Sequence, residues 1–483
     1  MEAIVGIGAG KLRGTVRDGV AAFLGIPYAA PPNGANRFAA PQPAAQWDGV
    51  RDALVYGPTA PKPGYPAPFD ELLSDPDIPG EDYLNLNVWA PAGAERAPVM
   101  VFIHGGAFRN GSGAVGVYQG GAFARDGVVC VTFNYRLGVE GFGNLPGAPA
   151  NRGLLDQIAA LRWVRDNIGA FGGDPANVTV FGESAGAFSV LTLLSLDLGL
   201  FRRAISQSGG GQVAQDPADA LLITKEIAQR LGVEPTAAGF ATVPPEELVP
   251  AQTAVAAEIA GVPDPVRWGR TTTSSGMAFM PVLDGELIRQ RPEDAIAGGA
   301  GREVELLIGY TAEEFRFFFV PNGLAAVIDA SLAGRIIEGM GMDPALLAAY
   351  ERDRTIGDAF CAVITDGFFR VPSNRVADGH AASPTFMYEF GWRSPEQDLG
   401  ACHALELAFV FDNLARQDGA KLTGPNPPQE LADVMHRAWV DFAAHGDPGW
   451  SRFDRDRRLV KVFDGAQNEV IADPRGDERR LWQ

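Results

Sequence analysis

From about residue 97 onward, compact apolar runs alternate along the chain with longer stretches in which apolar residues recur at every third or fourth position. The runs 98–104 (PVMVFIH), 127–135 (GVVCVTFNY) and 177–181 (NVTVF) have the length of strands. Between the second and third run, the spacing of apolar residues over 154–171 predicts a helix that is buried on one face. This alternation is typical of an α/β protein with a large, mostly parallel sheet and helices on both of its faces.

The second half of the chain continues the pattern with two more predicted strands, 303–308 (EVELLI) and 385–390 (TFMYEF). A helix is predicted after Asn426-Pro427-Pro428, because the apolar residues that follow fall on one helical face. Two Ala-rich segments have the pattern of helical insertions, 212–260 and 320–360. No stretch has the composition of a linker, so we expect residues 1–483 to form a single domain.

Composition and charge narrow the classes of partner. The chain has 59 acidic and 40 basic side chains and a net charge of −19, which disfavours binding to nucleic acid and to anionic membrane surfaces. Its three cysteines do not suggest a disulfide framework or a zinc site. We see no signal peptide and no apolar run of the roughly 18 residues that a membrane span needs. A cytoplasmic protein is therefore the expectation, although a chain from which a leader had been removed would look the same.

The strongest chemical signal is Gly182-Glu183-Ser184-Ala185-Gly186, a G-x-S-x-G pentapeptide between a predicted strand and a predicted helix. A sharp reversal from strand to helix strains the central residue, and the flanking glycines prevent collisions across the turn. The hydroxyl of Ser184 is thereby raised at the carboxyl end of the strand, with the Ala185 N–H directed at a developing oxyanion. An ordinary glycine-rich turn would give the same bare pattern, but this context favours a nucleophile.

A second glycine-rich segment, His104-Gly105-Gly106-Ala107-Phe108, ends a predicted strand upstream of the serine. An acyl-transfer enzyme needs two or more N–H groups that converge on the substrate oxygen, and paired glycines let the backbone approach closely enough to supply them. Alone, the segment would be a simple turn after a strand. Together with the downstream pentapeptide it predicts an oxyanion loop.

An activated serine needs a general base that is oriented by a carboxylate. Of the five histidines, four have other predicted places: His104 in the glycine loop, His380 in a helical segment, and His436 and His445 in the last helix. His403 follows the strand 385–390 by a loop, where a catalytic histidine belongs in such a sheet.

The acid is less well determined by the residues alone. Glu313 and Glu314 lie just past the strand 303–308 and between the serine and the histidine, which fits the chain order Ser, acid, His. Either glutamate could serve on this ground, and solvated surface acids would look the same.

The chain resembles the type-B carboxylesterase (cholinesterase-like) family, and most closely its bacterial para-nitrobenzyl-esterase-like members. The likeness runs over nearly the whole length and includes the HGGAF and GESAG segments described above. The other matching segments are 23–32 (FLGIPYAAPP), 81–89 (EDYLNLNVW), 134–138 (NYRLG), 153–157 (GLLDQ), 171–175 (FGGDP), 200–209 (LFRRAISQSG) and 400–411 (GACHALELAFVF).

The resemblance implies an α/β-hydrolase fold with a Ser184, Glu314, His403 triad, because the family's acid lies five residues after a glycine and its histidine lies in a G-x-x-H-x-x-E pattern. By the same analogy, the N–H groups of Gly105, Gly106 and Ala185 form the oxyanion hole. Glu183 and Ser208 are expected beside the triad. Two structural ion pairs are also implied, Arg37–Glu81 and Arg136–Asp156.

The sequence departs from the family pattern at two informative places. The family often has Asp-Glu-Gly at the acid, whereas here Phe315 follows Glu314, so we expect a negative φ at Phe315 and a place for its ring in the pocket. Ala60 and Tyr83 stand where many members have a disulfide, which favours a reducing compartment. The predicted pocket walls are Phe108, Phe315 and Phe318.

The predicted activity is hydrolysis of small carboxylic esters with short to medium acyl groups, through an acyl-enzyme on Ser184 and without a metal or organic cofactor. An amidase, a transacylase or a specialised detoxifying hydrolase would carry the same triad. A non-catalytic binding protein could keep the fold, but the presence of all three triad residues argues against it. The expected assembly is a monomer or a small homo-oligomer.

Overall fold

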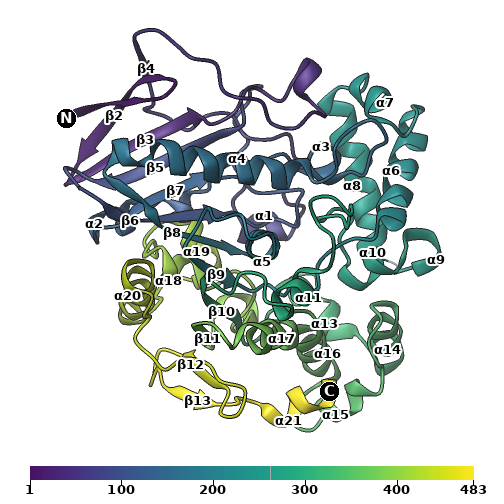
Figure 1. Ribbon diagram of the computed structural model, residues 1–483. Helices are drawn as coiled ribbons and strands as arrows, with labels where there is room; N and C mark the ends of the chain where they lie inside the picture. Colours follow the sequence, from purple (N-terminus) through teal and green to yellow (C-terminus); the bar gives the residue numbers. More distant parts are fainter. Residues whose placement is uncertain (262) are drawn as a thin grey trace.

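Thirteen strands join one sheet in the computed structural model, which describes residues 1–261 and 263–483 (Figure 1). The sheet order is β1-β2-β3-β5-β7-β6-β8-β9-β10-β11-β12-β13, with β4 paired to β2. The strands are β1 (Glu2–Ile7), β2 (Gly10–Arg17), β3 (Val20–Pro27), β4 (Val50–Asp52), β5 (Asn85–Pro91), β6 (Ala97–Ile103), β7 (Val129–Phe133), β8 (Gly173–Glu183), β9 (Arg203–Gln207), β10 (Glu305–Thr311), β11 (Thr385–Phe390), β12 (Leu459–Phe463) and β13 (Val470–Ala472).

The centre of the sheet is parallel and its two ends are antiparallel. Strands β7, β6, β8, β9, β10, β11 and β12 all run in the same direction. The amino-terminal hairpins and β13 add antiparallel strands at the edges. The predicted strands are confirmed, with β11 at its predicted residues. Strand β10 runs past Gly309 to Thr311, and a Cβ at Gly309 would lie 2.2 Å from the ring of Tyr388 in β11.

Helices cover both faces of the sheet, as the alternating pattern predicted. In β6, Val99, Val101 and Ile103 face one apolar core, while Met100 and Phe102 face the other. The first core is covered by α4 (Arg152–Asn167), α5 (Ala185–Leu194) and α17 (Val371–His380). The second is covered by α2 (Gly121–Arg125), α18 (Leu407–Val410) and α20 (Gln429–His445). Burial on two faces explains why the central strands are apolar at almost every position.

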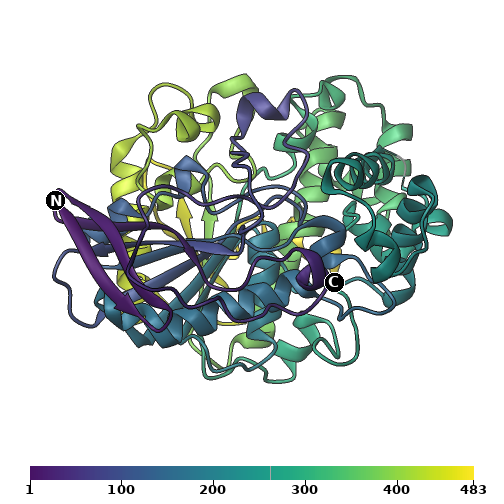
Figure 2. The ribbon, with the colours of Figure 1, turned by 90° about the horizontal axis from the view of Figure 1, so that it is seen from above.

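The two Ala-rich segments form helical insertions, as predicted. The first holds α6 (Pro217–Leu231), α7 (Ala237–Ala241), α8 (Pro245–Gly261), α9 (Pro265–Trp268) and α10 (Arg270–Ser275). The second holds α13 (Leu324–Val327), α14 (Ala330–Gly339), α15 (Leu346–Tyr350) and α16 (Ile356–Thr365). Both gather on the side of the molecule away from the amino-terminal strands (Figures 1 and 2). Among the described residues, no helix combines the length and apolarity that a bilayer crossing requires.

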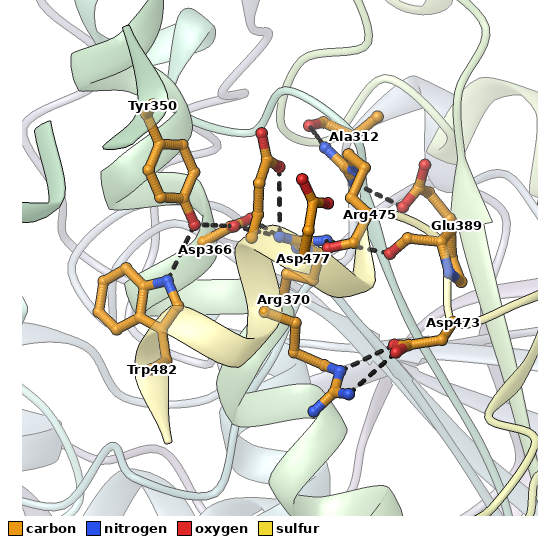
Figure 3. A network of polar contacts seen from close by, with 12 residues as sticks. Ala312, Tyr350, Asp366, Arg370, Glu389, Asp473, Arg475, Asp477 and Trp482 are labelled. Carbon is orange, nitrogen blue, oxygen red and sulfur yellow. Dashed lines mark hydrogen bonds and ion pairs between the residues drawn. The ribbon is translucent and has the colours of Figure 1, made fainter. Parts of the chain in front are cut away.

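The carboxyl-terminal segment is held against the sheet by a buried polar network (Figure 3). Arg370 pairs with Asp366, both in a π-helical turn labelled η4 (Asp366–Arg370), and donates to the Pro474 carbonyl at 3.1 Å. Arg475 donates to the carbonyl of Ala312, at 3.2 Å, just after β10. At the chain end, Trp482 Nε1 donates to the hydroxyl of Tyr350 at 2.9 Å. The network therefore joins the last residues of the chain to η4 and to the end of β10.

One of the two expected ion pairs is wrong. Arg136 and Asp156 are paired at 2.7 Å and both are fully buried, as predicted. Arg37, however, pairs with Glu140 at 2.7 Å, whereas Glu81 accepts a hydrogen bond from Asn33. Glu140 lies in the buried helix α3 (Gly138–Phe142), while Glu81 is exposed, so only Glu140 can neutralise a guanidinium that is itself mostly buried.

Candidate active site

Ser184 occupies the sharp turn between β8 and α5, with φ 54° and ψ −122°. Such a backbone conformation costs a residue with a side chain on the order of 1–3 kcal/mol, and the surrounding packing must impose it. The two glycines of the pentapeptide are required by close packing. A Cβ on Gly186 would lie 1.9 Å from the carbonyl oxygen of Ile103, and a Cβ on Gly182 would lie 2.6 Å from the backbone of Gly186. Side chains at either position would push the turn away from β6.

The predicted site residues gather at one edge of the sheet. Ser184 follows β8, Ser208 follows β9, Glu314 follows β10, and His403 lies in the loop after β11. Because these strands are parallel and adjacent, their carboxyl ends meet at the same edge. Residues that are far apart in the chain thereby share one cavity.

His403 is held by Glu314. Nδ1 of His403 lies 2.6 Å from Oε2 of Glu314, whose other oxygen accepts a hydrogen bond from the Thr311 N–H at 2.8 Å. Glu314 is completely buried, and the rings of Phe318 and Phe369 pack near the imidazole, with centroids 5.3 and 5.0 Å away. The imidazole is therefore fixed in orientation, with Nε2 turned away from Glu314.

The neighbouring Glu313 has a different environment. Its carboxylate pairs with Arg393 at 2.5 Å and accepts the N–H of Ala401 at 2.9 Å. The next residue, Phe315, has φ −78°. This negative value was expected, because the chain has phenylalanine where the family often has glycine. The structure thus brings Glu314, and not Glu313, to the histidine.

The other histidines make local contacts elsewhere. A ring nitrogen of His104 lies 2.8 Å from the Gly105 carbonyl, one of His380 lies 2.8 Å from the Thr385 hydroxyl, and one of His436 lies 2.7 Å from the Val410 carbonyl. Burial lowers the pKa of each of these three imidazoles, which keeps them neutral.

Two further carboxyl groups are buried beside His403. Oε1 of Glu183 lies 3.0 Å from Nε2 of His403. Glu406 is buried three residues after the histidine, where its carboxylate accepts from Gln207 at 3.1 Å. Burial raises the pKa of Glu183 to about 7 and that of Glu406 to about 8. Burial alone would lower the pKa of His403, but the carboxylates of Glu183 and Glu314 outweigh it and raise that pKa to about 9. The two carboxylates therefore stabilise the imidazolium that forms when His403 accepts a proton.

The glycine loop packs directly on the serine turn. A Cβ on Gly105 would lie 2.7 Å from the Glu183 carboxylate and 3.1 Å from the Ser184 Cβ, and Gly106 has φ 109°. The N–H groups of Gly105 and Gly106 donate no hydrogen bond to any described residue. Ala185 is the first residue of α5, so its N–H has no partner within the helix. Among the residues that the structure describes, none of these three N–H groups has a hydrogen-bond partner.

A mostly apolar cavity of about 580 Å³ opens onto Ser184 and His403. Phe315 and Phe318 line it, as predicted. The prediction for Phe108 is wrong: its side chain is fully buried and packs on Phe142, with ring centroids 4.6 Å apart. With φ 57°, the backbone at Phe108 turns the ring into the core and leaves the neighbouring residues Ala107 and Arg109 to face the cavity.

Comparison with known proteins decides the family. The model of the carboxylesterase family matches residues 1–457. The chain belongs to the carboxylesterase family. It is 36% identical to para-nitrobenzyl esterase from Bacillus subtilis, over 98% of this chain and 96% of that protein. It is also 36% identical to phenmedipham hydrolase from Pseudarthrobacter oxydans, over 96% of each.

Solved structures agree with this assignment. The crystal structure of a Geobacillus stearothermophilus carboxylesterase superposes with a TM-score of 0.87 at 38% identity, covering 99% of this chain and 100% of that one. The α/β-hydrolase fold predicted from the resemblance is confirmed. The protein is a serine carboxylesterase, a hydrolase that acts on small carboxylic esters.

Sequence reasoning missed two groups in this carboxylesterase's site. Glu406 was visible as the last residue of the G-x-x-H-x-x-E pattern, but nothing local to it predicts its burial next to two other carboxylates. Arg109 directly follows the glycine loop, but no pattern in the sequence assigns it to the pocket. Its position as the fifth residue after His104 was the only signal.

Proposed function

We propose that Ser184, His403 and Glu314 are the catalytic triad of this esterase, with the N–H groups of Gly105, Gly106 and Ala185 as its oxyanion hole. The observation that carries the proposal is the 2.6 Å contact between His403 and a fully buried Glu314, beside a strained serine at the base of the cavity. Glu183 and Ser208 lie next to this group at the ends of β8 and β9. Ser208 also has φ 54°, and its hydroxyl is buried.

The reaction follows from these positions in two steps. His403 takes the proton of Ser184 at Nε2 while Oγ of Ser184 attacks the ester carbonyl, and the three N–H groups hold the tetrahedral oxyanion. The protonated imidazole, stabilised by the carboxylates of Glu314 and Glu183, then gives its proton to the leaving alcohol. Water repeats the attack on the acyl-enzyme, assisted by the same base, and the carboxylic acid leaves. No metal or organic cofactor takes part in these steps.

The preferred substrates are esters with short to medium acyl groups. The apolar wall formed by Phe315, Phe318 and Phe369 and the cavity volume of about 580 Å³ support this proposal, since a cavity of that size suits a small apolar ligand. We also propose a single domain, because the one sheet joins strands from residue 2 to residue 472. A cytoplasmic location and a monomer or small homo-oligomer remain our expectations.

The test is hydrolysis of para-nitrophenyl acetate, butyrate and octanoate by wild type and Ser184→Ala. Loss of a triad serine lowers kcat by roughly four to six orders of magnitude. Ser195→Ala is a matched control, because Ser195 caps the other end of α5 and its hydroxyl donates only to the Thr192 carbonyl.

A phosphonate reagent that modifies active serines should label a peptide that contains Ser184 in the wild type. Near-wild-type turnover by Ser184→Ala, or labelling at another serine, would refute the assignment. The ratio of the octanoate and acetate rates then measures the acyl preference independently.

A further inference from the structure

One basic side chain of the catalytic cavity has no hydrogen-bond or ion-pair partner among the described residues. Arg109 lines the cavity three residues after Gly106 and is mostly buried. Within residues 1–261 and 263–483, its guanidinium makes no hydrogen bond and has no carboxylate within 4 Å, and apart from burial only the phenol of Tyr65 affects its pKa. A partly buried guanidinium in this position lacks the ion pair or hydrogen bonds that buried charges normally have.

Other buried arginines of this protein show the contrast. Arg152 has no carboxylate within 4 Å among the described residues, but its guanidinium donates hydrogen bonds to four backbone carbonyls, those of Val139, Glu140, Gly143 and Pro149. Arg136 is paired with Asp156 and also donates to the Ala39 carbonyl at 2.6 Å. The fold thus satisfies guanidinium groups that serve its structure. Arg109, which lines the cavity, has no such partner among the described residues.

The surroundings of Arg109 add two further free donors. Tyr65 and Tyr118 line the same cavity, and their hydroxyls make no hydrogen bond with any described residue. Both phenols are protonated and able to donate at neutral pH, and burial raises the pKa of each still further.

The acids near this corner are already engaged. Asp75 is paired with Lys62 at 3.5 Å and accepts from Asn110 at 3.1 Å, and Asp418 accepts from Ser74 at 2.5 Å. Neither lies within ion-pair distance of Arg109. Glu183 also lines the cavity, where its carboxylate is held 3.0 Å from His403. A cation with two hydroxyl donors, beside acids that already have partners, is the donor set that suits a carboxylate.

We infer that Arg109, together with Tyr65 and Tyr118, binds a free carboxylate on the substrate, so that the preferred esters are half-esters of dicarboxylic acids or esters of hydroxy acids. The backbone of Arg109 closes a turn onto Gly106, with its N–H 3.0 Å from the Gly106 carbonyl. Its guanidinium is therefore within one side-chain length of the oxyanion loop, and the bound carboxylate lies a few bonds from the ester carbonyl. The inference rests on the proposed function, because it assumes that Gly106 holds the reacting oxygen.

The test compares esters that differ only in the charged group. Monoethyl adipate and its terminal amide place the carboxylate on the acyl side. The butyrate esters of 4-hydroxybenzoic acid and 4-hydroxybenzamide place it on the alcohol side. We expect the wild type to have the higher kcat/KM for the carboxylate member of one pair. Arg109→Gln should lower kcat/KM for that member by about 10- to 100-fold, and it should change kcat/KM for the amide member by no more than about threefold. Arg109→Lys should restore part of the preference, since it keeps the charge but not the planar fork.

Arg335→Gln is the matched control, because Arg335 is exposed on α14, the helix whose Ile336 also lines the cavity. Equal losses on both members of a pair would overturn the inference and make Arg109 a structural residue. An unchanged preference in Arg109→Gln would overturn it as well. Cleavage of the ester bond in the two uncharged amide compounds depends on the esterase site alone. If that cleavage is absent, the proposed function is refuted, and the carboxylate site is not. Calorimetric titration of adipate into wild type and Arg109→Gln tests that site without turnover, and equal affinity for both proteins would also refute it.

Discussion

The two adjacent glutamates after β10 allow the triad acid to be tested with a matched pair of substitutions. In Glu314→Gln, one oxygen is replaced by an NH₂ group, while the native carboxylate accepts from Thr311 with one oxygen and faces Nδ1 of His403 with the other. The amide can satisfy only one of these two contacts. If its NH₂ group faces Nδ1, the imidazole proton must move to Nε2, the nitrogen that has to accept the proton of Ser184.

We expect Glu314→Gln to lower kcat by roughly a thousand- to ten-thousand-fold, the effect of placing the imidazole proton on the wrong nitrogen in a catalytic triad. That loss corresponds to about 4 to 5.5 kcal/mol of transition-state stabilisation. Glu313→Gln should change kcat by less than about threefold, because Glu313 pairs with Arg393 at the surface and its side chain is 24% exposed.

The assay is steady-state hydrolysis of para-nitrophenyl butyrate at pH 8, with thermal melting of each variant to show that it is folded. Comparable losses in Glu313→Gln and Glu314→Gln, with both proteins folded, would refute the argument. A larger loss in Glu313→Gln would reverse the assignment of the acid.

Three other outcomes are expected, two at the active site and one in the carboxyl-terminal polar network. Glu183→Gln removes a carboxylate that raises the pKa of His403, so the acidic limb of the kcat/KM profile should move to lower pH, whereas Ser208→Ala should leave the limb in place. Burial raises the pKa of Glu406 from 4.5 to about 8, so the folded protein binds more protons than the unfolded chain between these values and loses stability as the pH rises through them. Glu406→Gln should therefore reduce the difference in urea-unfolding free energy between pH 5 and pH 8, and an unchanged difference would contradict this reasoning. Arg370→Met leaves the buried carboxylate of Asp366 without its cation and should cost about 3–5 kcal/mol in urea unfolding. Arg352→Met, in an exposed pair with Asp477, should cost at most about 1 kcal/mol. If Arg370→Met also costs no more than this, the network in Figure 3 does not stabilise the protein.

Much of the fold and of the site could be predicted because the signals are local. The apolar runs of the central strands, the helix spacing after Asn151 and the G-x-S-x-G turn each depend on residues within about a dozen positions of one another. Chain order added the rest, since residues that follow parallel strands must meet at one edge of the sheet. That is why Ser184 and His403 could be placed together without a structure.

The α/β architecture, the position of the strained serine and two candidate glutamates for the acid could be predicted from the residues alone. The folded chain was needed to show which glutamate faces His403, that Arg37 pairs with Glu140 instead of Glu81, and that the ring of Phe108 enters the core while Arg109 lines the cavity. These outcomes depend on burial and on the direction of single side chains. Both are set by packing between segments that are distant in the chain, 89 residues apart for Glu314 and His403 and 103 for Arg37 and Glu140, and local sequence does not specify that packing.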